Sequence, residues 1–407
     1  MEYKTFELDN GIRLIHLPVP NTVAYAGMII NAGTRDENED EHGIAHFIEH
    51  VIFKGTKRRK AYHILSRMED VGGDIDAYTT KEKTCLYATF MHNYYERTID
   101  LISDILFNSV FPQKELEKEK TVIVDEINSY KDSPAEQIFD DFEEFVYPNH
   151  PLGRNILGTK KSLKSFKKSH IQEFMQRNYH TDQMVFCSVG NINFEKLVKI
   201  FSKYFSTVPE NRKKTSGLNK PVYSKIVKTV KKNTFQSHCI MGNEAFSIMD
   251  KNRLSMVMLN NILGGPGLNS RLNLVLREKY GFVYNVESNY EPYRDCGLFS
   301  IYFGTDPDNL DRSMELINKE LKLIKTKKMG TLQLHKAKNQ IIGQVAISAD
   351  SHSNLLFTLG KSYLIFGKVD DLETIQRKVE AISAETLIET ANLILDDNQM
   401  SVLIYKK

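Results

Sequence analysis

Alternating apolar and polar residues open the chain, which is the pattern of half-buried β-strands. The alternation predicts strands over residues 4–9, 12–18 and 23–31, with Asp9-Asn10-Gly11 as a hairpin signal. Farther along, apolar spacing predicts the following elements: a helix around 61–71, strands around 74–80 and 84–91, long helices before and after Pro112, a helix near 168–178 and a strand over Met184–Val189. The first half of the chain is therefore expected to combine a sheet with several helices.

The same order of elements recurs in the second half. Its pattern predicts strands near 225–232 and 235–242, a helix from about 250, a helix across 270–279, strands over 283–290 and 297–304, several further helices and a closing strand over 401–405. The glycine run Gly264–Gly267 lacks the Lys-Ser/Thr of a phosphate loop, so we interpret it as a hinge or turn before a helix. This duplicated plan predicts an α+β fold of two similar domains, each a mixed β-sheet backed by helices.

The boundary between the halves is expected in the least apolar stretch, Pro209–Pro221, which has turn formers and charges but no periodicity. A chain of 407 residues exceeds what one hydrophobic core usually supports, so two domains are expected. We therefore predict an N-terminal domain over residues 1–210, a linker over 211–221 and a C-terminal domain over 222–407.

Composition and charge exclude several classes of function. Hydrophobic residues make up 41% of the chain, charged residues 26%, and the formal net charge is +2, which is typical of a globular protein. The basic clusters are scattered and lack interleaved aromatic residues, so nucleic-acid binding is not expected. The amino terminus has no apolar signal core, and no apolar stretch approaches twenty residues. We expect a cytoplasmic protein without a membrane segment.

The four cysteines show neither metal-binding nor redox spacing. They are widely separated along the chain, at Cys85, Cys187, Cys239 and Cys296. We interpret them as small buried hydrophobic residues.

The strongest chemical signal is the sequence His46-Phe47-Ile48-Glu49-His50 on a predicted helix. Residues four apart lie on the same helix face, so His46 and His50 can bind one zinc ion while Glu49 reaches the water on it. The order H-x-x-E-H is the inverzincin signature. His42 is expected near the helix start, because residues 42–50 span about 12 Å of helix axis, too far for one ion. The alternative is a solvated helix that carries two histidines by chance.

A catalytic zinc needs a third protein ligand, and Glu126 is the candidate. It lies on a predicted helix whose buried stripe is expected to contain Leu116, Val122, Ile123 and Ile127. Glu119 lies nearly two turns earlier on the Glu126 side, where it can orient a ligand or the water. From the pattern alone, each glutamate would more often be an ordinary surface carboxylate. The acidic segment Asp36–Glu41 precedes the histidine helix, and its charges suit a helix amino terminus.

Together these motifs resemble the pitrilysin (M16, inverzincin) family of zinc peptidases, and the resemblance covers essentially the whole chain. The length is similar to the short, single-subunit branch, which includes the mitochondrial processing peptidase and bacterial processing-peptidase-like proteins. The residues that carry the resemblance are the H-x-x-E-H motif, Glu119-x6-Glu126, Ser270-Arg271-Leu272, Leu276-Arg277-Glu278 and Gly281-Phe282-Val283-Tyr284.

The resemblance implies a role for each matching residue. One zinc ion (Zn2+) per subunit is held by His46, His50 and Glu126. Glu49 is the general base and proton shuttle, and Glu119 is an outer carboxylate.

The resemblance also implies that Arg277 and Tyr284 reach into the catalytic chamber from another domain. There the phenol can stabilise the tetrahedral oxyanion, and the guanidinium can hold substrate carbonyls.

An exposed edge strand that pairs with extended peptide is implied over residues 72–79, with Gly73, Asp76, Ala77 and Tyr78 as substrate-binding residues. The family often has asparagine where this chain has Asp76. A carboxylate only accepts hydrogen bonds, whereas an amide also donates, so side-chain recognition at this position is expected to differ.

The resemblance therefore implies a zinc metalloendopeptidase that cleaves extended or unfolded peptides. Each subunit would form half of a clamshell, so a homodimer is expected in which Arg277 and Tyr284 act in trans on the partner's site. The alternatives are a non-catalytic subunit and a subunit that works beside a second, different chain. The homodimer is favoured because this chain carries both the zinc motif and the Arg/Tyr pair.

Overall fold

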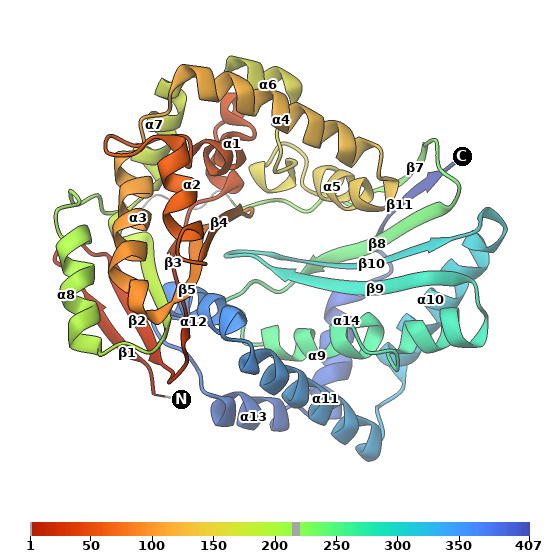
Figure 1. The fold of residues 1–407 in the computed structure, drawn as a ribbon. Coiled ribbons are helices and arrows are strands. Elements are labelled where there is room, and N and C mark those ends of the chain that lie inside the picture. Colours follow the sequence, from red (N-terminus) through yellow and green to blue (C-terminus); the bar gives the residue numbers. More distant parts are fainter. Residues whose placement is uncertain (1, 214–219) are drawn as a thin grey trace. The chain divides into compact units, whose positions relative to one another are not determined.

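The computed structural model describes residues 2–213 and 220–407, and it contains two mixed β-sheets with helices packed on them (Figure 1). The six-stranded sheet has the order β1-β2-β6-β3-β5-β4. Its strands are β1 (Lys4–Glu7), β2 (Arg13–Pro18), β3 (Val23–Ile30), β4 (Asp74–Thr79), β5 (Thr84–Met91) and β6 (Met184–Gly190). The helices of this half of the chain are α1 (Ile44–Val51), α2 (Ala61–Glu69), α3 (Tyr95–Asn108), α4 (Gln113–Lys131), α5 (Pro134–Val146), α6 (Lys160–Ser165), α7 (Lys168–Asn178) and α8 (Phe194–Phe205).

The five-stranded sheet has the order β7-β11-β8-β10-β9. Its strands are β7 (Val227–Lys231), β8 (Ser237–Ala245), β9 (Val283–Pro292), β10 (Gly297–Thr305) and β11 (Ser401–Lys406). The helices of this half are α9 (Arg253–Gly264), a π-helix η6 (Asn273–Lys279), α10 (Leu310–Thr326), α11 (Thr331–Asp350), α12 (His352–Phe366), α13 (Leu372–Glu380) and α14 (Ala384–Ile394).

The two sheets repeat one plan. Strands β2 to β6 and strands β7 to β11 each follow the spatial order first, fifth, second, fourth, third. In both sheets the first and fifth strands pair in parallel and the other pairs are antiparallel. Strand β1 is an addition at the edge of the first sheet. The predicted α+β fold with a duplicated mixed sheet is therefore confirmed.

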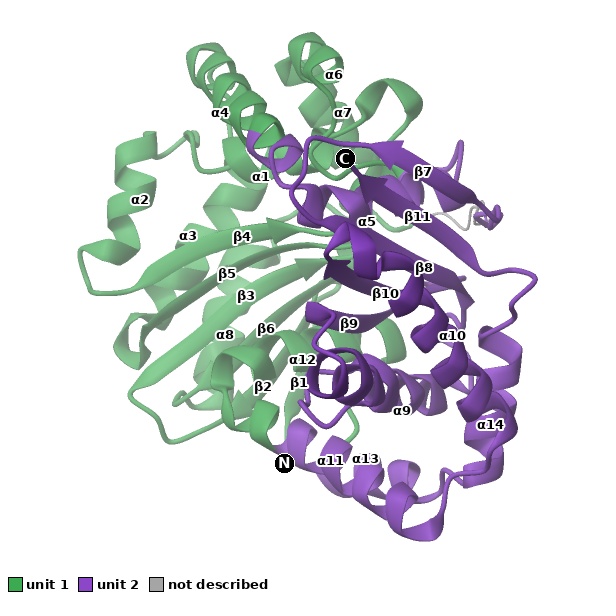
Figure 2. Cartoon of the chain, turned by 90° about the vertical axis from the view of Figure 1, so that its right-hand side faces the viewer, with its two compact units in different colours: residues 1–128, 154–216, 347–371 green, residues 129–153, 217–346, 372–407 purple. Residues whose placement is uncertain are grey.

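The chain divides into two compact units that exchange a helix each (Figure 2). Unit 1 comprises residues 1–128, 154–216 and 347–371, and unit 2 comprises residues 129–153, 217–346 and 372–407. Helix α5, from the first half of the sequence, packs on β8 and β11 in unit 2. Helix α12, from the second half, packs on β2, β3 and β6 in unit 1.

This division differs from the contiguous domains expected over 1–210 and 222–407. The reason for this exchange is burial, because each sheet has apolar residues on both faces. The helices of the same repeat cover one face, and the helix from the other repeat covers the second face. Residues 214–219 of the expected linker 211–221 lie outside the described residues. The segment before them belongs to unit 1, where the Asn211 carbonyl oxygen accepts a hydrogen bond from Thr181 N at 2.8 Å.

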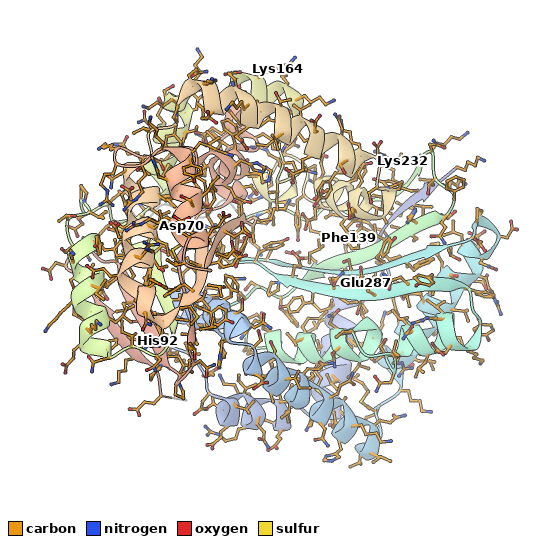
Figure 3. All side chains as sticks on the ribbon, in the orientation of Figure 1. Asp70, His92, Phe139, Lys164, Lys232 and Glu287 are labelled. Atoms are coloured by element: carbon orange, nitrogen blue, oxygen red, sulfur yellow. The ribbon has the colours of Figure 1, made fainter. Side chains whose placement is uncertain are left out.

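Each exchanged helix completes a hydrophobic core. On α12, Leu355, Leu356 and Leu359 are buried in a cluster with strand residues that include Ile29 and Cys187. On α5, the buried side chains Ile138, Phe142 and Val146 join Ile240, Leu403 and Tyr405 of the second sheet. Phe139 of α5, labelled in Figure 3, also contacts Tyr302 of β10, with ring centroids 4.9 Å apart.

The cysteines agree with the expectation from the sequence. All four cysteines are free thiols and buried. Among the described residues, no helix has both the length and the apolar character needed to cross a bilayer.

The contact of α12 with its sheet yields a stability prediction. A Cβ atom at Gly360 would lie 2.0 Å from Cys187 Sγ and 2.5 Å from Ile29 Cδ1, so Gly360→Ala should destabilise the protein by about 1–3 kcal/mol through overpacking. Gly343, in α11, has no atom within 4 Å of a built Cβ, so Gly343→Ala should stabilise it by about 0.5–1 kcal/mol. Urea denaturation of both variants measures the effect. Equal stabilities would show that α12 does not pack closely on this sheet.

Candidate metal centre

Helix α1 carries the H-x-x-E-H motif, and its apolar side chains are buried. Ile44, Phe47, Ile48 and Val51 are fully buried, which fixes the helix against the core of unit 1. His46 lies on the same helix with only 6% of its surface exposed. Glu49 and His50 are half-buried. His42 precedes the helix, as expected, and its Nε2 lies 2.8 Å from the carbonyl oxygen of Asn155.

A buried carboxylate holds the amino terminus of α1. Glu37, 3% exposed, accepts hydrogen bonds from Gly43 N at 2.9 Å and Ala45 N at 3.0 Å. These N–H groups have no intrahelical partner at a helix start, and the helix dipole favours a negative group there. Burial raises the pKa of Glu37 to about 8, against the lowering effect of the two N–H donors. The sequence indicated an acidic helix start over Asp36–Glu41, but it did not single out Glu37.

Helix α4 supplies the two further glutamates. Leu116, Ile123 and Ile127 are buried, as expected for a helical stripe. The expectation that Val122 belongs to this stripe was wrong, because its side chain is 49% exposed. One residue advances about 100° around a helix, so position 122 turns away from the face that position 123 buries.

Three predicted ligands converge in unit 1. One ligand atom from each of His46, His50 and Glu126 lies within 4.8 Å of the others. Glu126 Oε2 is 3.7 Å from His46 Nε2 and 3.5 Å from His50 Nε2. A tetrahedral zinc with ligand bonds of about 2.1 Å separates its ligand atoms by about 3.4 Å. The two nitrogens and one oxygen therefore fit a zinc ion that keeps one coordination position open.

The environment of His46 favours the neutral imidazole that binds metals. Burial, followed by the nearby His50, lowers the pKa of His46 to about 3. Its Nδ1 is buried without a hydrogen-bond partner among the described residues, while its Nε2 lies toward Glu126. An unprotonated ring can therefore offer the Nε2 lone pair to a cation.

Glu119 contacts the second histidine from the opposite side of the ring. Its Oε2 lies 3.4 Å from His50 Nδ1, and its Oε1 pairs with Lys54 Nζ at 2.8 Å. A carboxylate on Nδ1 fixes the ring so that Nε2 is free to bind a metal, a common arrangement around zinc ligands. Sequence reasoning predicted Glu119 in this outer position but missed Lys54, for which no motif gave a signal.

Glu49 projects from α1 beside the end of strand β4. Burial raises the pKa of Glu49 to about 7, hydrogen bonds with Thr79 lower it, and the charges of Asp76 and Glu126 raise it further. A carboxylate with a pKa near neutrality is suited to take up and release a proton.

The predicted substrate strand is the outer strand of its sheet. Strand β4 pairs only with β5 among the described strands, and Gly73 directly precedes it. The carboxylate of Asp76 accepts hydrogen bonds from Tyr87 Oη at 3.2 Å and from Ala77 N at 2.8 Å. The Tyr78 ring contacts Phe357 of α12, with centroids 5.4 Å apart. The exchanged helix therefore borders this strand.

Arg277 and Tyr284 belong to unit 2, whereas the metal-site residues belong to unit 1. Both line one cavity of about 300 Å3 within unit 2. Arg277 lies on the π-helix η6, where the sequence predicted an ordinary helix over 270–279. Such wider helical turns are rare and occur frequently at functional sites. Tyr284 is 84% exposed.

Two family models match the chain. Residues 15–160 match the family described as insulinase (peptidase family M16), and residues 165–341 match the peptidase M16 inactive domain. The first range contains His46, Glu49, His50 and Glu126.

Named relatives match over nearly the full length. The uncharacterized zinc protease YmxG of Bacillus subtilis is 32% identical over 403 residues, which is 98% of this chain and 98% of that protein. Mitochondrial-processing peptidase subunit beta of Saccharomyces cerevisiae is 30% identical, over 98% of this chain and 90% of that protein.

Solved structures share the fold. A protease from Helicobacter pylori superimposes with a TM-score of 0.91 at 20% identity, covering 100% of this chain and 99% of that one. The peptidase M16 inactive domain from Pseudomonas fluorescens superimposes with a TM-score of 0.92 at 18% identity, covering 100% of this chain and 98% of that one.

The cap at the start of α1 yields a prediction about the metal centre. Glu37→Gln places an amide where both carboxylate oxygens accept N–H groups, so it should cost about 1–3 kcal/mol of stability and weaken zinc binding. Glu39→Gln, at an exposed neighbour, is the control and should change neither quantity. Urea denaturation and a competitive zinc chelator measure the two effects. Unchanged zinc affinity in Glu37→Gln would contradict a role for this cap in orienting the ligands.

Proposed function

The chain belongs to peptidase family M16, and from this premise we propose that it is a zinc-dependent endopeptidase that cleaves extended or unfolded peptides. The observation that carries the proposal is the convergence of His46, His50 and Glu126, with Glu49 one residue before the second histidine. Relatives named zinc proteases support zinc as the ion. One ion per subunit is our proposal, because each chain offers one such group among its described residues.

A zinc ion held by this group would supply Lewis acidity, lowering the pKa of a water molecule and polarising a peptide carbonyl. The side chains of the protein supply the proton transfers. Glu49 would accept the proton of the attacking water and then donate it to the leaving amine. The neutral His46 keeps its lone pair available, and Glu119 holds the His50 ring through Nδ1.

The outer strand β4 would hold the substrate. An edge strand offers unpaired main-chain groups to which an extended peptide can add as a further strand. Strand β4 is favourably placed because it contacts α1, the helix that carries Glu49, so a peptide on this edge would lie beside the base. Pairing through main-chain groups requires an unfolded segment, so folded proteins should be poor substrates.

We also propose that two copies of the chain form the working chamber and that Arg277 and Tyr284 act in trans. Their location in unit 2 and the high exposure of Tyr284 support this arrangement, since the phenol is available to a second subunit. The intact set of ligands and base disfavours a purely non-catalytic subunit. A heterodimer with a different chain stays the alternative, and a location in the cytoplasm stays a prediction from the sequence.

Removing the metal or the base should separate their roles. Zinc chelation should abolish cleavage of an unstructured peptide, and added zinc should restore it. Glu49→Gln should lower the rate by about 100- to 10,000-fold while the protein still binds zinc, because only the base is lost. Glu126→Gln should lose both zinc and activity. Metal analysis and peptide cleavage check these outcomes, and full activity after chelation would refute the proposal.

Mixed dimers test the trans arrangement. A Glu49→Gln chain combined with a Tyr284→Phe chain should recover activity, because the intact Glu49 of one subunit then meets the intact Tyr284 of the other. A chain carrying both substitutions, mixed with Glu49→Gln, is the control and should recover none. Cleavage no greater than that of either parent would show that each subunit uses its own tyrosine.

A further inference from the structure

Lys54 lies in the turn that follows helix α1, and the backbone of this turn is fixed on both sides of it. The Lys54 N–H donates a hydrogen bond to the Val51 carbonyl oxygen at 3.1 Å, at the end of the helix. Farther along the turn, Thr56 Oγ1 donates to Asp104 Oδ2 at 2.7 Å, and Asp104 is fully buried. The backbone from which the Lys54 side chain extends is therefore held in a defined position.

The Lys54 side chain ends at Glu119 of α4. Its Nζ lies 2.8 Å from Glu119 Oε1, and the lysine side chain is only 25% exposed. The other oxygen, Glu119 Oε2, lies 3.4 Å from His50 Nδ1. Among the described residues, Lys54 and His50 are the two hydrogen-bonding or ionic partners of the Glu119 side chain. One carboxylate therefore connects a lysine from outside the H-x-x-E-H motif to a proposed metal ligand.

The two contacts of Glu119 differ in strength. A charge-assisted hydrogen bond between a cationic N–H and a carboxylate is typically about 2.7–2.9 Å long, and the contact with Lys54 falls in this range. The contact with His50, at 3.4 Å, is longer than the usual limit of about 3.2 Å. The lysine is therefore the stronger restraint on the carboxylate, and the position of Oε2 beside His50 depends on it.

The burial of Glu119 makes the cation necessary. Its side chain is 11% exposed, and a buried carboxylate that loses its cationic partner costs far more than an exposed one. A surface pair on the same helix shows the contrast, because Lys120 Nζ lies 2.9 Å from Glu117 Oε1 but Glu117 is 57% exposed. Exposed pairs of this kind contribute little. Without Lys54, the Glu119 carboxylate would turn toward water rather than keep its place at His50.

We propose that Lys54 is a positioning residue of the metal centre, which holds Glu119 so that Glu119 in turn holds the His50 ring. The Nε2 atom of that ring lies 3.5 Å from Glu126 Oε2, so the orientation of the ring decides whether the three ligand atoms stay together. The inference rests on the proposed zinc peptidase function and adds to it a residue from outside the motif.

The direction of the change in zinc affinity separates positioning from simple charge. Lys54 is positively charged, and a positive charge repels a divalent cation, so if charge alone mattered Lys54→Met would tighten zinc binding. Positioning predicts the opposite, a weakening of about three- to tenfold, because loss of an outer partner of a metal ligand costs about 10- to 100-fold and Lys54 acts one residue farther out. Lys54→Arg keeps the cation and should recover most of the affinity.

Zinc affinity of the full-length protein, measured by competition with a fluorescent chelator, tests the proposal independently of peptide cleavage. Lys54→Met is compared with the unsubstituted protein and again in a Glu119→Gln background. In that background Lys54→Met should no longer weaken zinc binding, because the lysine acts through the carboxylate. Lys120→Met is the matched control, since Lys120 pairs with an exposed glutamate of the same helix, and it should leave zinc affinity unchanged.

Unchanged or tighter zinc binding by Lys54→Met would overturn the proposal, and so would an equal weakening in the Glu119→Gln background. In either case zinc binding and zinc-dependent cleavage by the unsubstituted chain would still support the peptidase function. Absence of zinc binding by the unsubstituted chain would instead reject the function itself.

Discussion

The structure depends on one constraint, which is that both faces of each sheet must be buried. Helices from the two halves of the sequence together bury them. The strands of a sheet project side chains to two faces, and here both faces of the inner strands are apolar. The helices of each repeat cover one face, and a single helix from the other repeat, α5 or α12, covers the second. The two halves of the sequence are therefore similar repeats, but they are not separate folding units. The exchange also places α12 beside β4, where Phe357 contacts Tyr78 of the strand proposed to hold substrate.

The two repeats share one plan but carry different residues beside their outer strands. In the first repeat, the helix next to the outer strand carries two histidines and a carboxylate, and α4 adds the third ligand. In the second repeat, Arg277 and Tyr284 line a cavity beside the outer strand β9. The first set suits a divalent cation.

Desolvation sets the protonation states at the metal centre. Burial lowers the pKa of His46 and raises that of Glu49, so both side chains favour their neutral forms without a metal ion. Neutral imidazole is the ligand form, so burial prepares His46 for binding. For Glu49 the carboxylate is the form that acts as base, and the positive charge of a bound cation would favour it. The helix that carries both residues is fixed by the buried Glu37 at its amino terminus.

The sequence by itself determined the elements, the repeat and the common helix face of His46, Glu49 and His50, because these depend on local periodicity and on short spacings. His46, Glu49 and His50 lie on one helix turn and the next, so their common face follows from helix geometry alone. The pairing of Glu126 with them, and the roles of Arg277 and Tyr284, came from a family resemblance rather than from local physics. The tertiary structure alone decided the exchange of α5 and α12, the exposure of Val122, and the contacts of Glu37 and Lys54. These depend on which distant segments pack together, and apolar spacing specifies that a face is buried without specifying the partner that buries it.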